Sequence, residues 1–275
     1  MKKEIVPFLK WAGGKRWFVQ SHADKLPRTF NRYIEPFLGG GSVYFYLKPR
    51  NAILGDLNPD VVAAYQGIKE NWQSLRTSLL SRQKKHSDEY FYKTRAKTPA
   101  SLTERAARMI YLNRTCFNGI YRVNRNGQFN VPRGSKNEVL LDSDDFKGAS
   151  DLLADAVIRL ADFEVLINEA TDGDLIFADP PYTVRHNYNG FVKYNEVLFS
   201  WADQERLAKA LIRARERGAQ IVATNANHHS VRGLYDIEGF ELHAVSRFSS
   251  ISAAGASRRQ FEELVILANT NKRAE

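Results

Sequence analysis

Hydrophobic residues recur along the chain in two alternating patterns, one typical of strands and the other of helices. Short apolar runs bounded by turn residues predict strands at residues 33–34, 51–56, 163–165, 175–178, 220–226 and 261–269. Helical spacing and helix-start signals predict helices at residues 42–47, 61–80, 102–112, 151–160 and 200–217. This alternation predicts an α/β fold built on a mostly parallel sheet.

The run Leu175–Ala178 is the clearest predicted strand, and it stops at a carboxylate. A Thr-Asp-Gly turn precedes the run, and Asp179, Pro180, Pro181 and Tyr182 follow it. Because proline has no N–H and a fixed φ, the strand cannot continue through these positions. Asp179 is therefore expected at the carboxyl edge of the sheet, where open α/β folds bind ligands.

A carboxylate, a rigid carbonyl and an aromatic ring side by side fit a planar heterocycle that carries an amino group. Asp179 can accept one N–H of such an amine, the Pro180 carbonyl can accept the other, and Tyr182 can stack on the ring. Two acceptors would turn the nitrogen lone pair toward an electrophile. The alternative is a strand-end aspartate that caps a neighbouring loop, with prolines that only end the strand.

Two glycine loops near the start of the chain offer close backbone approach to a ligand. FLKWAGGKRW, residues 8–17, leads through Gly13-Gly14 to Lys15, but its spacing does not match a P-loop. A glycine turn with a surface lysine is the alternative. YIEPFLGGGS, residues 33–42, predicts a strand, a glycine loop and a helix start, the arrangement that brings N–H groups to a cofactor in Rossmann-like sheets.

The strand at residues 51–56 ends in Asp56, about 17 positions after Gly39. An acid near this spacing reaches ribose hydroxyls in dinucleotide sites. The pattern therefore predicts a cofactor that contains a nucleoside, without requiring a pyrophosphate. Asn58-Pro59 is expected to end this unit as a turn.

The composition of the chain indicates what kind of partner the protein binds and in which cellular compartment it is expected. The net charge of +9 and a pI near 9.5 favour a polyanionic partner. Cys116 is the single cysteine, which excludes an internal disulfide and a cysteine-rich zinc site. No apolar run approaches the roughly 20 residues of a membrane span, and MKKEIVPF lacks the apolar part of a secretion signal. A cytoplasmic protein with no membrane association is expected.

Residues 60–115 interrupt the α/β alternation with basic helical segments, which indicates an inserted subdomain. Ser101 to Glu104 form a capping-box pattern at the start of one helix. Further on, Asn126-Gly127 lies between Tyr121-Arg122-Val123 and Phe129-Asn130-Val131, a strong β-hairpin signal. Arginine, asparagine and aromatic side chains read base edges and stack on bases. An ordinary solvated basic hairpin is the alternative.

Four segments in this order, FLKWAGGK, EPFLGGGS, GDLNPD and ADPPY, make the chain resemble the S-adenosylmethionine-dependent DNA N6-adenine methyltransferases of the Dam type. The resemblance covers nearly the whole chain. It implies a Rossmann-like sheet whose last strand is antiparallel, and direct methyl transfer to N6 of an adenine flipped out of double-stranded DNA. It implies no covalent intermediate and no metal.

The resemblance also assigns roles to individual residues. The residues expected to be catalytic are Asp179, Pro180, Pro181 and Tyr182. Those expected to bind S-adenosylmethionine are Trp11, Ala12, Gly13, Lys15, Glu35, Pro36, Phe37, Gly39, Gly40, Gly41, Ser42, Asp56 and Asp179. Those expected to bind DNA are Lys10, Asn118, Ile120, Arg122, Asn124, Arg125, Asn130, Pro132 and Lys136.

In the Dam type, the segment at residues 113–136 favours the site GATC. Asn118 and Arg122 match residues that contact bases, Ile120 matches a residue that wedges into the duplex, and Lys10 matches a lysine near the first guanine. The sequence departs from the family at Ser135, where a basic residue is usual, and Lys136 follows one place later. GATC is therefore the expected site, and Ser135 is the position that departs from the pattern on which this expectation rests.

The resemblance implies a division into two parts and a monomer in solution. Residues 1–58 and 146–275 form the catalytic domain, and residues 59–145 form the target-recognition subdomain. The segment at residues 183–199 is expected to be a loop over the active site, and Arg247 to Arg259 a flexible connector. His228 and His229 are interpreted as exposed loop histidines, because no further metal ligands lie near them in the sequence.

Several alternatives stay open. The same fold could act at another DNA site, on cytosine N4 or on RNA adenine, or serve as a DNA-binding relative without activity. A glutamine N5 methyltransferase usually has Asn in place of Asp179 and lacks the basic hairpin. Cytosine C5 methylation needs a cysteine nucleophile that usually follows a proline, whereas Cys116 follows Thr115.

Overall fold

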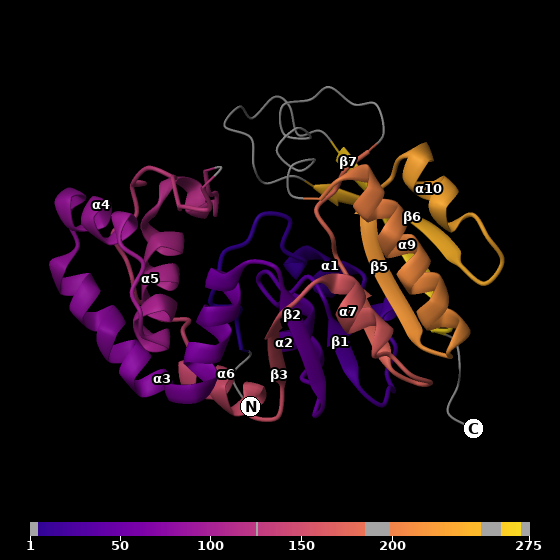
Figure 1. Ribbon diagram of the computed structural model, residues 1–275, viewed down its shortest axis with the longest axis horizontal. Coiled ribbons are helices and arrows are strands. Elements are labelled where there is room, and N and C mark those ends of the chain that lie inside the picture. The colour runs from indigo at the N-terminus through magenta and orange to yellow at the C-terminus, as the bar shows by residue number, and fades with distance from the viewer. Residues whose placement is uncertain (1–4, 125, 185–198, 249–259, 271–275) are drawn as a thin grey trace. The chain divides into compact units, whose positions relative to one another are not determined.

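The computed structural model describes residues 5–124, 126–184, 199–248 and 260–270 (Figure 1). The chain forms two compact units, Met1–Val19 with Leu38–Leu160, and Gln20–Phe37 with Ala161–Glu275. The boundaries of these two units differ from the expected boundaries between the catalytic domain and the target-recognition subdomain. The expected functional boundaries stay a prediction.

The described strands form a seven-stranded sheet in the order β3-β2-β1-β4-β5-β7-β6. The strands are β1 Tyr33–Glu35, β2 Ala52–Asp56, β3 Val157–Leu160, β4 Leu175–Ala178, β5 Gln220–Ala226, β6 Glu241–Phe248 and β7 Gln260–Ala268. The pairs β2/β3, β1/β4 and β4/β5 are parallel, whereas β7 runs antiparallel to both β5 and β6. The fold is therefore the mostly parallel, Rossmann-like α/β sheet with an antiparallel last strand that the sequence predicted.

Helices flank the strands in both units. Their bounds are α1 Arg16–Ser21, α2 Ser42–Leu47, α3 Pro59–Lys85, α4 Asp88–Ala96, α5 Leu102–Thr115, α6 Phe146–Leu153, α7 Phe163–Asn168, α9 Trp201–Glu216 and α10 His229–Tyr235, with short 3-10 turns at Ala23–Lys25 and Phe117–Gly119. No helix within the described ranges is both long and apolar enough to cross a membrane.

In the first unit, α3, α4 and α5 pack together (Figure 1). Ser101 caps α5 as predicted, because its hydroxyl accepts a hydrogen bond from the backbone N–H of Glu104. Asn58 and Pro59 do not end the preceding unit as a turn. The Asn58 side chain accepts from the N–H groups of Asp60 and Val61, and Pro59 occupies the first helical turn, where its missing N–H is harmless.

The segment from residue 151 to 168 corrects two predictions. Residues 157–160 form strand β3 and not a helix, since they pair in parallel register with β2. Residues 163–165 begin helix α7 and not a strand. Asp162 starts that helix, because its carboxylate accepts from the N–H of Glu164 at 2.9 Å. The sequence did not predict β3, because the side chains of this strand are only partly buried. Its residues therefore lack the continuous apolar pattern of a central strand.

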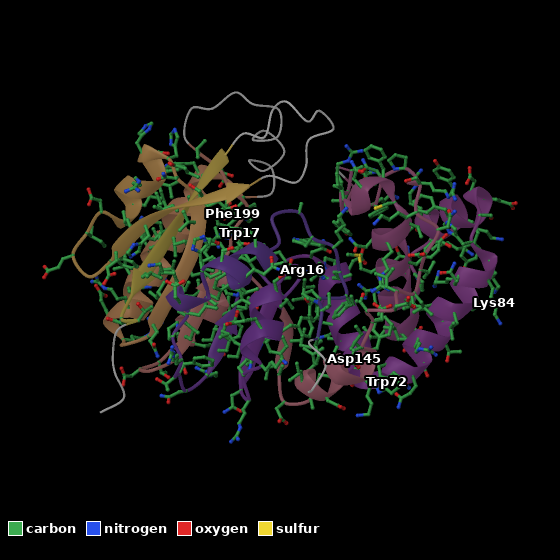
Figure 2. All side chains as sticks on the ribbon, turned by 180° about the vertical axis from the view of Figure 1, so that it is seen from behind. Arg16, Trp17, Trp72, Lys84, Asp145 and Phe199 are labelled. Carbon is green, nitrogen blue, oxygen red and sulfur yellow. The ribbon has the colours of Figure 1, made fainter. Side chains whose placement is uncertain are left out.

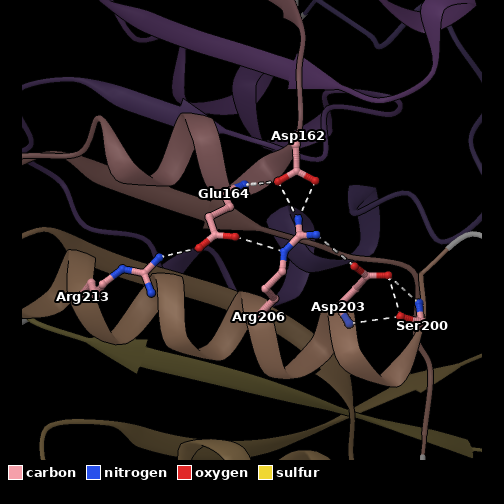
Figure 3. A network of polar contacts seen from close by, with 6 residues as sticks. All are labelled: Asp162, Glu164, Ser200, Asp203, Arg206 and Arg213. Atoms are coloured by element: carbon pink, nitrogen blue, oxygen red, sulfur yellow. Dashed lines mark hydrogen bonds and ion pairs between the residues drawn. The ribbon is translucent and has the colours of Figure 1, made fainter.

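In the second unit, a charged network joins α7 to α9 (Figure 3). The Arg206 guanidinium contacts Asp162 at 2.6 Å, Glu164 at 3.0 Å and Asp203 at 3.3 Å. Ser200 and Asp203 form a reciprocal capping box at the start of α9. The predicted helix at residues 200–217 is thereby confirmed, and it ends at Glu216, with Gly218 at φ +92° just past its C-cap.

The C-terminal part of the sheet differs from its prediction in one strand. β6 was not predicted, and Arg247, expected in a flexible connector, lies within it. The rest of that expected connector, residues 249–259, lies outside the described residues. β7 confirms the predicted last strand, and Leu264, Val265 and Ile266 in it are buried.

Candidate active site

Asp179 lies directly after β4, whose four residues are fully buried. β4 and β5 are parallel, with Ala178 opposite Ala223, so their carboxyl ends reach the same edge of the sheet. The buried Thr224 donates its hydroxyl hydrogen bond to Asp179 Oδ1 at 2.7 Å. One carboxylate oxygen is therefore held in a defined orientation by the neighbouring strand.

The chain after Asp179 is held at two further points. The Pro181 carbonyl accepts a hydrogen bond from Gln204 Nε2 at 3.3 Å. Gln204 is fully buried and its Oε1 accepts from Asn225 Nδ2 at 2.9 Å, which fixes the amide. The Tyr182 hydroxyl donates to Glu263 Oε2 at 2.6 Å. Pro180 itself is buried.

The sequence did not identify Thr224, Gln204 or Glu263 as members of this group. Two signals could have pointed to them. Thr224 belongs to the polar end of a predicted strand, QIVATNA, at the same sheet edge as Asp179. Glu263 is an acid at the start of an apolar run in the last strand.

The glycine loop between β1 and α2 is built around Asp56 in the first unit. Asp56 Oδ2 accepts from the Gly39 N–H at 2.9 Å, and Oδ1 accepts from the Asn58 N–H at 2.8 Å. Gly39 and Gly41 have φ of +46° and +63°, in the left-handed region that favours glycine. Desolvation raises the pKa of Asp56 from 3.8 to about 6, although these N–H groups oppose the shift.

The Trp11 indole lies against this loop. A Cβ added to Gly39 would stand 2.6 Å from Trp11 Cδ1, so only glycine allows this approach. Trp11 also stacks on Tyr121 of the recognition segment, with ring centroids 5.5 Å apart. Trp11 is thus in contact with both a glycine of the loop between β1 and α2 and the segment predicted to read DNA.

Lys15 is buried, so the alternative of a surface lysine after Gly13-Gly14 is wrong. Its Nζ donates to the Gly13 carbonyl at 2.8 Å, and this closes the loop on itself. The next residue, Arg16, is labelled in Figure 2. Its guanidinium donates to the Pro7 carbonyl. The glycine Gly13 has φ +78° and is exposed, as is Ala12.

The remaining residues expected at the cofactor are buried to different extents. Glu35 is 3% exposed and accepts from the Tyr33 hydroxyl at 2.9 Å. Phe37 stacks on Phe163 at 5.4 Å, a contact that serves packing within the second unit. Ser42 starts α2 and is largely buried. Gly40 and Pro36 are buried as well.

In the recognition segment, the structure brings Lys10 and Asn118 together. The Lys10 ammonium group donates to the Asn118 carbonyl. The buried Asn113 side chain bonds the Lys10 backbone at both its N–H and its carbonyl, each at 2.8 Å. Asn118 has φ +55°, and its side chain and the neighbouring Ile120 are exposed. These two side chains are therefore presented to solvent from a braced backbone.

The predicted hairpin exists as a turn with isolated bridges and not as two regular strands. Val123 pairs with Phe129, and the N–H of Asn130 donates to the Arg122 carbonyl. The Asn124 side chain accepts from the N–H groups of Asn126 and Gln128, so it shapes the turn itself. Arg125 lies outside the described residues.

Several hairpin side chains remain on the surface. Arg122 is exposed, and its Nε donates to Asn130 Oδ1 at 3.0 Å, which joins the two arms. Pro132 and Lys136 are exposed, as is Ser135. Arg133, next to the departure from the family, is engaged with Asp88 at 2.6 Å. Lys136 is therefore the better placed of the two cations to face a ligand.

Two cysteine and histidine predictions have different outcomes. Cys116 is buried, and desolvation raises the pKa of its thiol to about 11, which agrees with the absence of a thiolate nucleophile. His228 lies in the loop before α10, as predicted, and caps that helix by accepting from the Ser230 N–H. His229 is exposed, as predicted, but it is the first residue of the helix and not a loop residue.

The predicted loop over the active site lies almost entirely outside the described residues. Of residues 183–199, only Thr183, Val184 and Phe199 are described. The Thr183 hydroxyl donates to the Phe199 carbonyl at 2.6 Å, which joins the two ends of the segment. The loop's relation to the active site stays a prediction.

A parallel sheet that carries an Asp-Pro-Pro-Tyr sequence at its carboxyl edge defines a methyltransferase of the Rossmann-like class. The family model of the D12 class N6 adenine-specific DNA methyltransferases matches residues 11–251. The chain belongs to this family and is an adenine-specific DNA methyltransferase.

Curated relatives match over almost their full length. The Type II methyltransferase M1.LlaDCHI of Lactococcus lactis subsp. cremoris is 33% identical, and the match covers 96% of both chains. M.MjaIII of Methanocaldococcus jannaschii is 36% identical, over 96% of this chain and 99% of its own. The DNA adenine methylase of Haemophilus influenzae is 30% identical, over 97% and 94%. These matches confirm the family that the four sequence motifs indicated.

Proposed function

We propose that this enzyme transfers a methyl group from S-adenosylmethionine to N6 of an adenine flipped out of double-stranded DNA, with GATC as its site. The observation that carries the proposal is the Asp179–Tyr182 segment at the carboxyl end of β4, held by side chains from α9, β5 and β7. Such bracing matters because positioning is the main contribution that a protein makes to a direct transfer.

In this mechanism, Asp179 and the Pro180 carbonyl accept the two hydrogens of the adenine amino group. This orients the nitrogen lone pair toward the methyl group and stabilises the positive charge that develops on nitrogen. Tyr182 stacks on the flipped base. When bound, S-adenosylmethionine would supply an electrophilic methyl group on a sulfonium and leave as the thioether S-adenosylhomocysteine, and the methylated nitrogen would lose its extra proton to solvent. Thr224 keeps Asp179 in place through its 2.7 Å hydrogen bond.

The first unit offers a chemically suitable cradle for the nucleoside part of that cofactor. Asp56 at the end of β2 can accept hydrogen bonds from ribose hydroxyls, and the Trp11 indole supplies an apolar surface beside it. Gly39 and Gly40 bring their backbone up to that ring, where a side chain would collide or crowd. The other cofactor-binding residues implied by the resemblance belong to the same proposal.

Gly39→Ala is expected to weaken S-adenosylmethionine binding by about tenfold or more. Alanine at φ +46° is strained by roughly 1–2 kcal/mol, and its Cβ would push the Trp11 ring away. Isothermal titration of the cofactor measures the change. Gly127→Ala is the matched control, because its φ is +73° but no atom lies within 4 Å of the added Cβ. Equal loss of cofactor affinity in both variants would show that the contact with Trp11 is irrelevant.

Cofactor affinity is expected to rise by up to about tenfold between pH 5 and pH 7, because the ionised form of Asp56, whose pKa is about 6, accepts hydrogen bonds from ribose hydroxyls more strongly than the protonated acid does. The unliganded protein has the opposite trend. Since folding raises this pKa from 3.8, the folded state holds the proton more tightly, and stability from this group declines as pH rises from about 4 to 6. Titrations at constant ionic strength test the first trend. Asp56→Asn should bind weakly with no change over this range, and an unchanged pH dependence in that variant would contradict the assignment.

The proposal for DNA recognition rests on residues 59–145, with residues 1–58 and 146–275 as the catalytic part. Lys10, Asn118, Ile120 and Arg122 are exposed in the structure, as direct contact with a duplex requires. Asn124, Arg125, Asn130, Pro132 and Lys136 complete the proposed DNA-binding set. The excess of positive charge on the chain favours the phosphate backbone as well.

Methyl transfer from labelled S-adenosylmethionine to matched duplexes tests the proposal. The duplexes carry GATC, each single-base variant of it, or no site, and single-stranded DNA and duplex RNA are assayed in parallel. Labelling confined to GATC, on adenine N6, is expected. Labelling of a variant site would move the specificity to residues 118–136, whereas labelling of RNA alone or of cytosine would contradict the proposed substrate.

A further inference from the structure

Glu263 is a carboxylate buried within the sheet. It belongs to β7, opposite Ala226 of β5 and Val245 of β6, and is 5% exposed. The residues that follow it in β7 are apolar and buried. Because burial of a charged group opposes folding unless the group is hydrogen-bonded, a carboxylate at this position indicates a specific partner.

That partner includes the residue predicted to stack on the adenine. The Tyr182 hydroxyl and Glu263 Oε2 are 2.6 Å apart, the length of a hydrogen bond to an ionised acceptor. The backbone of Tyr182 follows two prolines, and the hydroxyl is held at the far end of the ring. The ring is thus attached at both ends, which restricts its rotation about the side-chain bonds.

The protonation state of Tyr182 preserves its hydrogen bond to Glu263. Desolvation, together with the charges of Asp179 and Glu263, raises the pKa of Tyr182 well above its ordinary value, so its hydroxyl stays protonated and able to donate. Thr224 on β5 donates to Asp179 and is also a hydrogen-bond partner of the Tyr182 hydroxyl. The Tyr182 hydroxyl is therefore held between β5 and β7, and its partner on β7 is Glu263.

We propose that Glu263 is a positioning residue for methyl transfer, which holds the Tyr182 ring in the plane in which it stacks on the target adenine. This inference rests on the proposed function and adds to it a residue outside the tetrapeptide. A loosened ring would leave the adenine less well aligned with the methyl group. Misplacement by about 1 Å can reduce a rate by roughly a hundredfold.

A double-mutant cycle tests the proposal through kcat and KM. Tyr182→Phe keeps the ring and removes the donor, and Glu263→Met keeps the length and removes the acceptor. Each is expected to lower kcat by about tenfold to a hundredfold, with KM for the duplex changed less than about threefold. The double variant should be no worse than Tyr182→Phe alone, within about twofold, because Tyr182→Phe already breaks the bond to Glu263 together with the contact to Thr224. Losses that multiply in the double variant would overturn the proposal.

Conservative and control variants separate positioning from stability. Glu263→Gln retains an acceptor and is expected to lose about threefold or less in kcat, so a loss as large as that of Glu263→Met would count against the hydrogen bond. Gln220→Met also removes a buried polar group, 6% exposed, from β5, and should lower Tm while leaving kcat unchanged. A fall in kcat for Gln220→Met equal to that for Glu263→Met would overturn the specific role of Glu263.

Two further outcomes are distinguishable. If Glu263→Met does not fold, Tyr182→Phe alone carries the test, and an unchanged kcat in that variant would overturn the proposal. Wild-type enzyme that labels no DNA overturns the proposed function and this inference together. Additive losses in an active enzyme overturn the role of Glu263 alone.

Discussion

Asp179→Ala is expected to reduce methyl transfer by at least about 10²–10³-fold while duplex binding changes less than about threefold. The loss follows because alanine cannot accept the hydrogen of the adenine amine or stabilise the positive charge that develops on nitrogen. Single-turnover labelling measures the transfer, and fluorescence anisotropy of a labelled duplex measures binding. Equal loss of both would show that Asp179 is a structural residue.

Asp174 provides a matched control at the opposite end of the same strand. It is 2% exposed and bonds to Arg32 at 2.8 Å, before β4 begins. Asp174→Asn should lower Tm without lowering the rate of transfer by the folded enzyme. A rate defect as large as that of Asp179→Ala would mean that any acid on β4 supports the fold on which activity depends.

Arg114→Met is expected to lower the free energy of unfolding by about 3–5 kcal/mol. Arg114 is 8% exposed and makes two 2.7 Å bonds to Asp144, with further bonds to the Phe8 and Val139 carbonyls. The substitution leaves the Asp144 charge, whose side chain is 9% exposed, without this partner. Since domains of this kind are stable by only about 5–15 kcal/mol, urea unfolding should show a large shift.

The control for this prediction is an exposed ion pair in the same unit. Lys147 and Asp151 are 2.7 Å apart, and their side chains are 66% and 62% exposed. Lys147→Ala should leave the free energy of unfolding almost unchanged, because exposed ion pairs contribute little to stability. A double variant, Arg114→Met with Asp144→Leu, should recover part of the stability, because no buried charge then remains unpaired. No recovery would indicate that the carbonyl contacts of Phe8 and Val139 carry the effect.

Local signals in the sequence predicted most elements that surround the site. The run Leu175–Ala178 ends at two prolines, and the structure confirms β4 there. The Ser200 cap and Gly218 bounded α9 correctly. Where the local signal was weak, the prediction was wrong. β3 is partly exposed, and Phe163 looked like strand sequence, although the Asp162 cap makes it the start of α7.

The sequence likewise allowed only part of the candidate site to be predicted. Asp179 and Tyr182 lie only three positions apart in the chain, so the sequence alone could suggest that they act together. Thr224, Gln204 and Glu263 lie 45, 23 and 81 positions from the residues that they hold. No periodicity links such positions, because their contacts depend on which strands become neighbours.

The sequence by itself determined the family: a glycine loop, an acid at a strand end and the Asp-Pro-Pro-Tyr segment follow one another in the order typical of adenine methyltransferases. Tertiary structure alone decided how those groups are held. The order β4-β5-β7 brings the ends of two other strands to the Asp-Pro-Pro-Tyr segment. Strand order follows from packing of the whole sheet, and a local pattern of apolar and polar residues does not specify it.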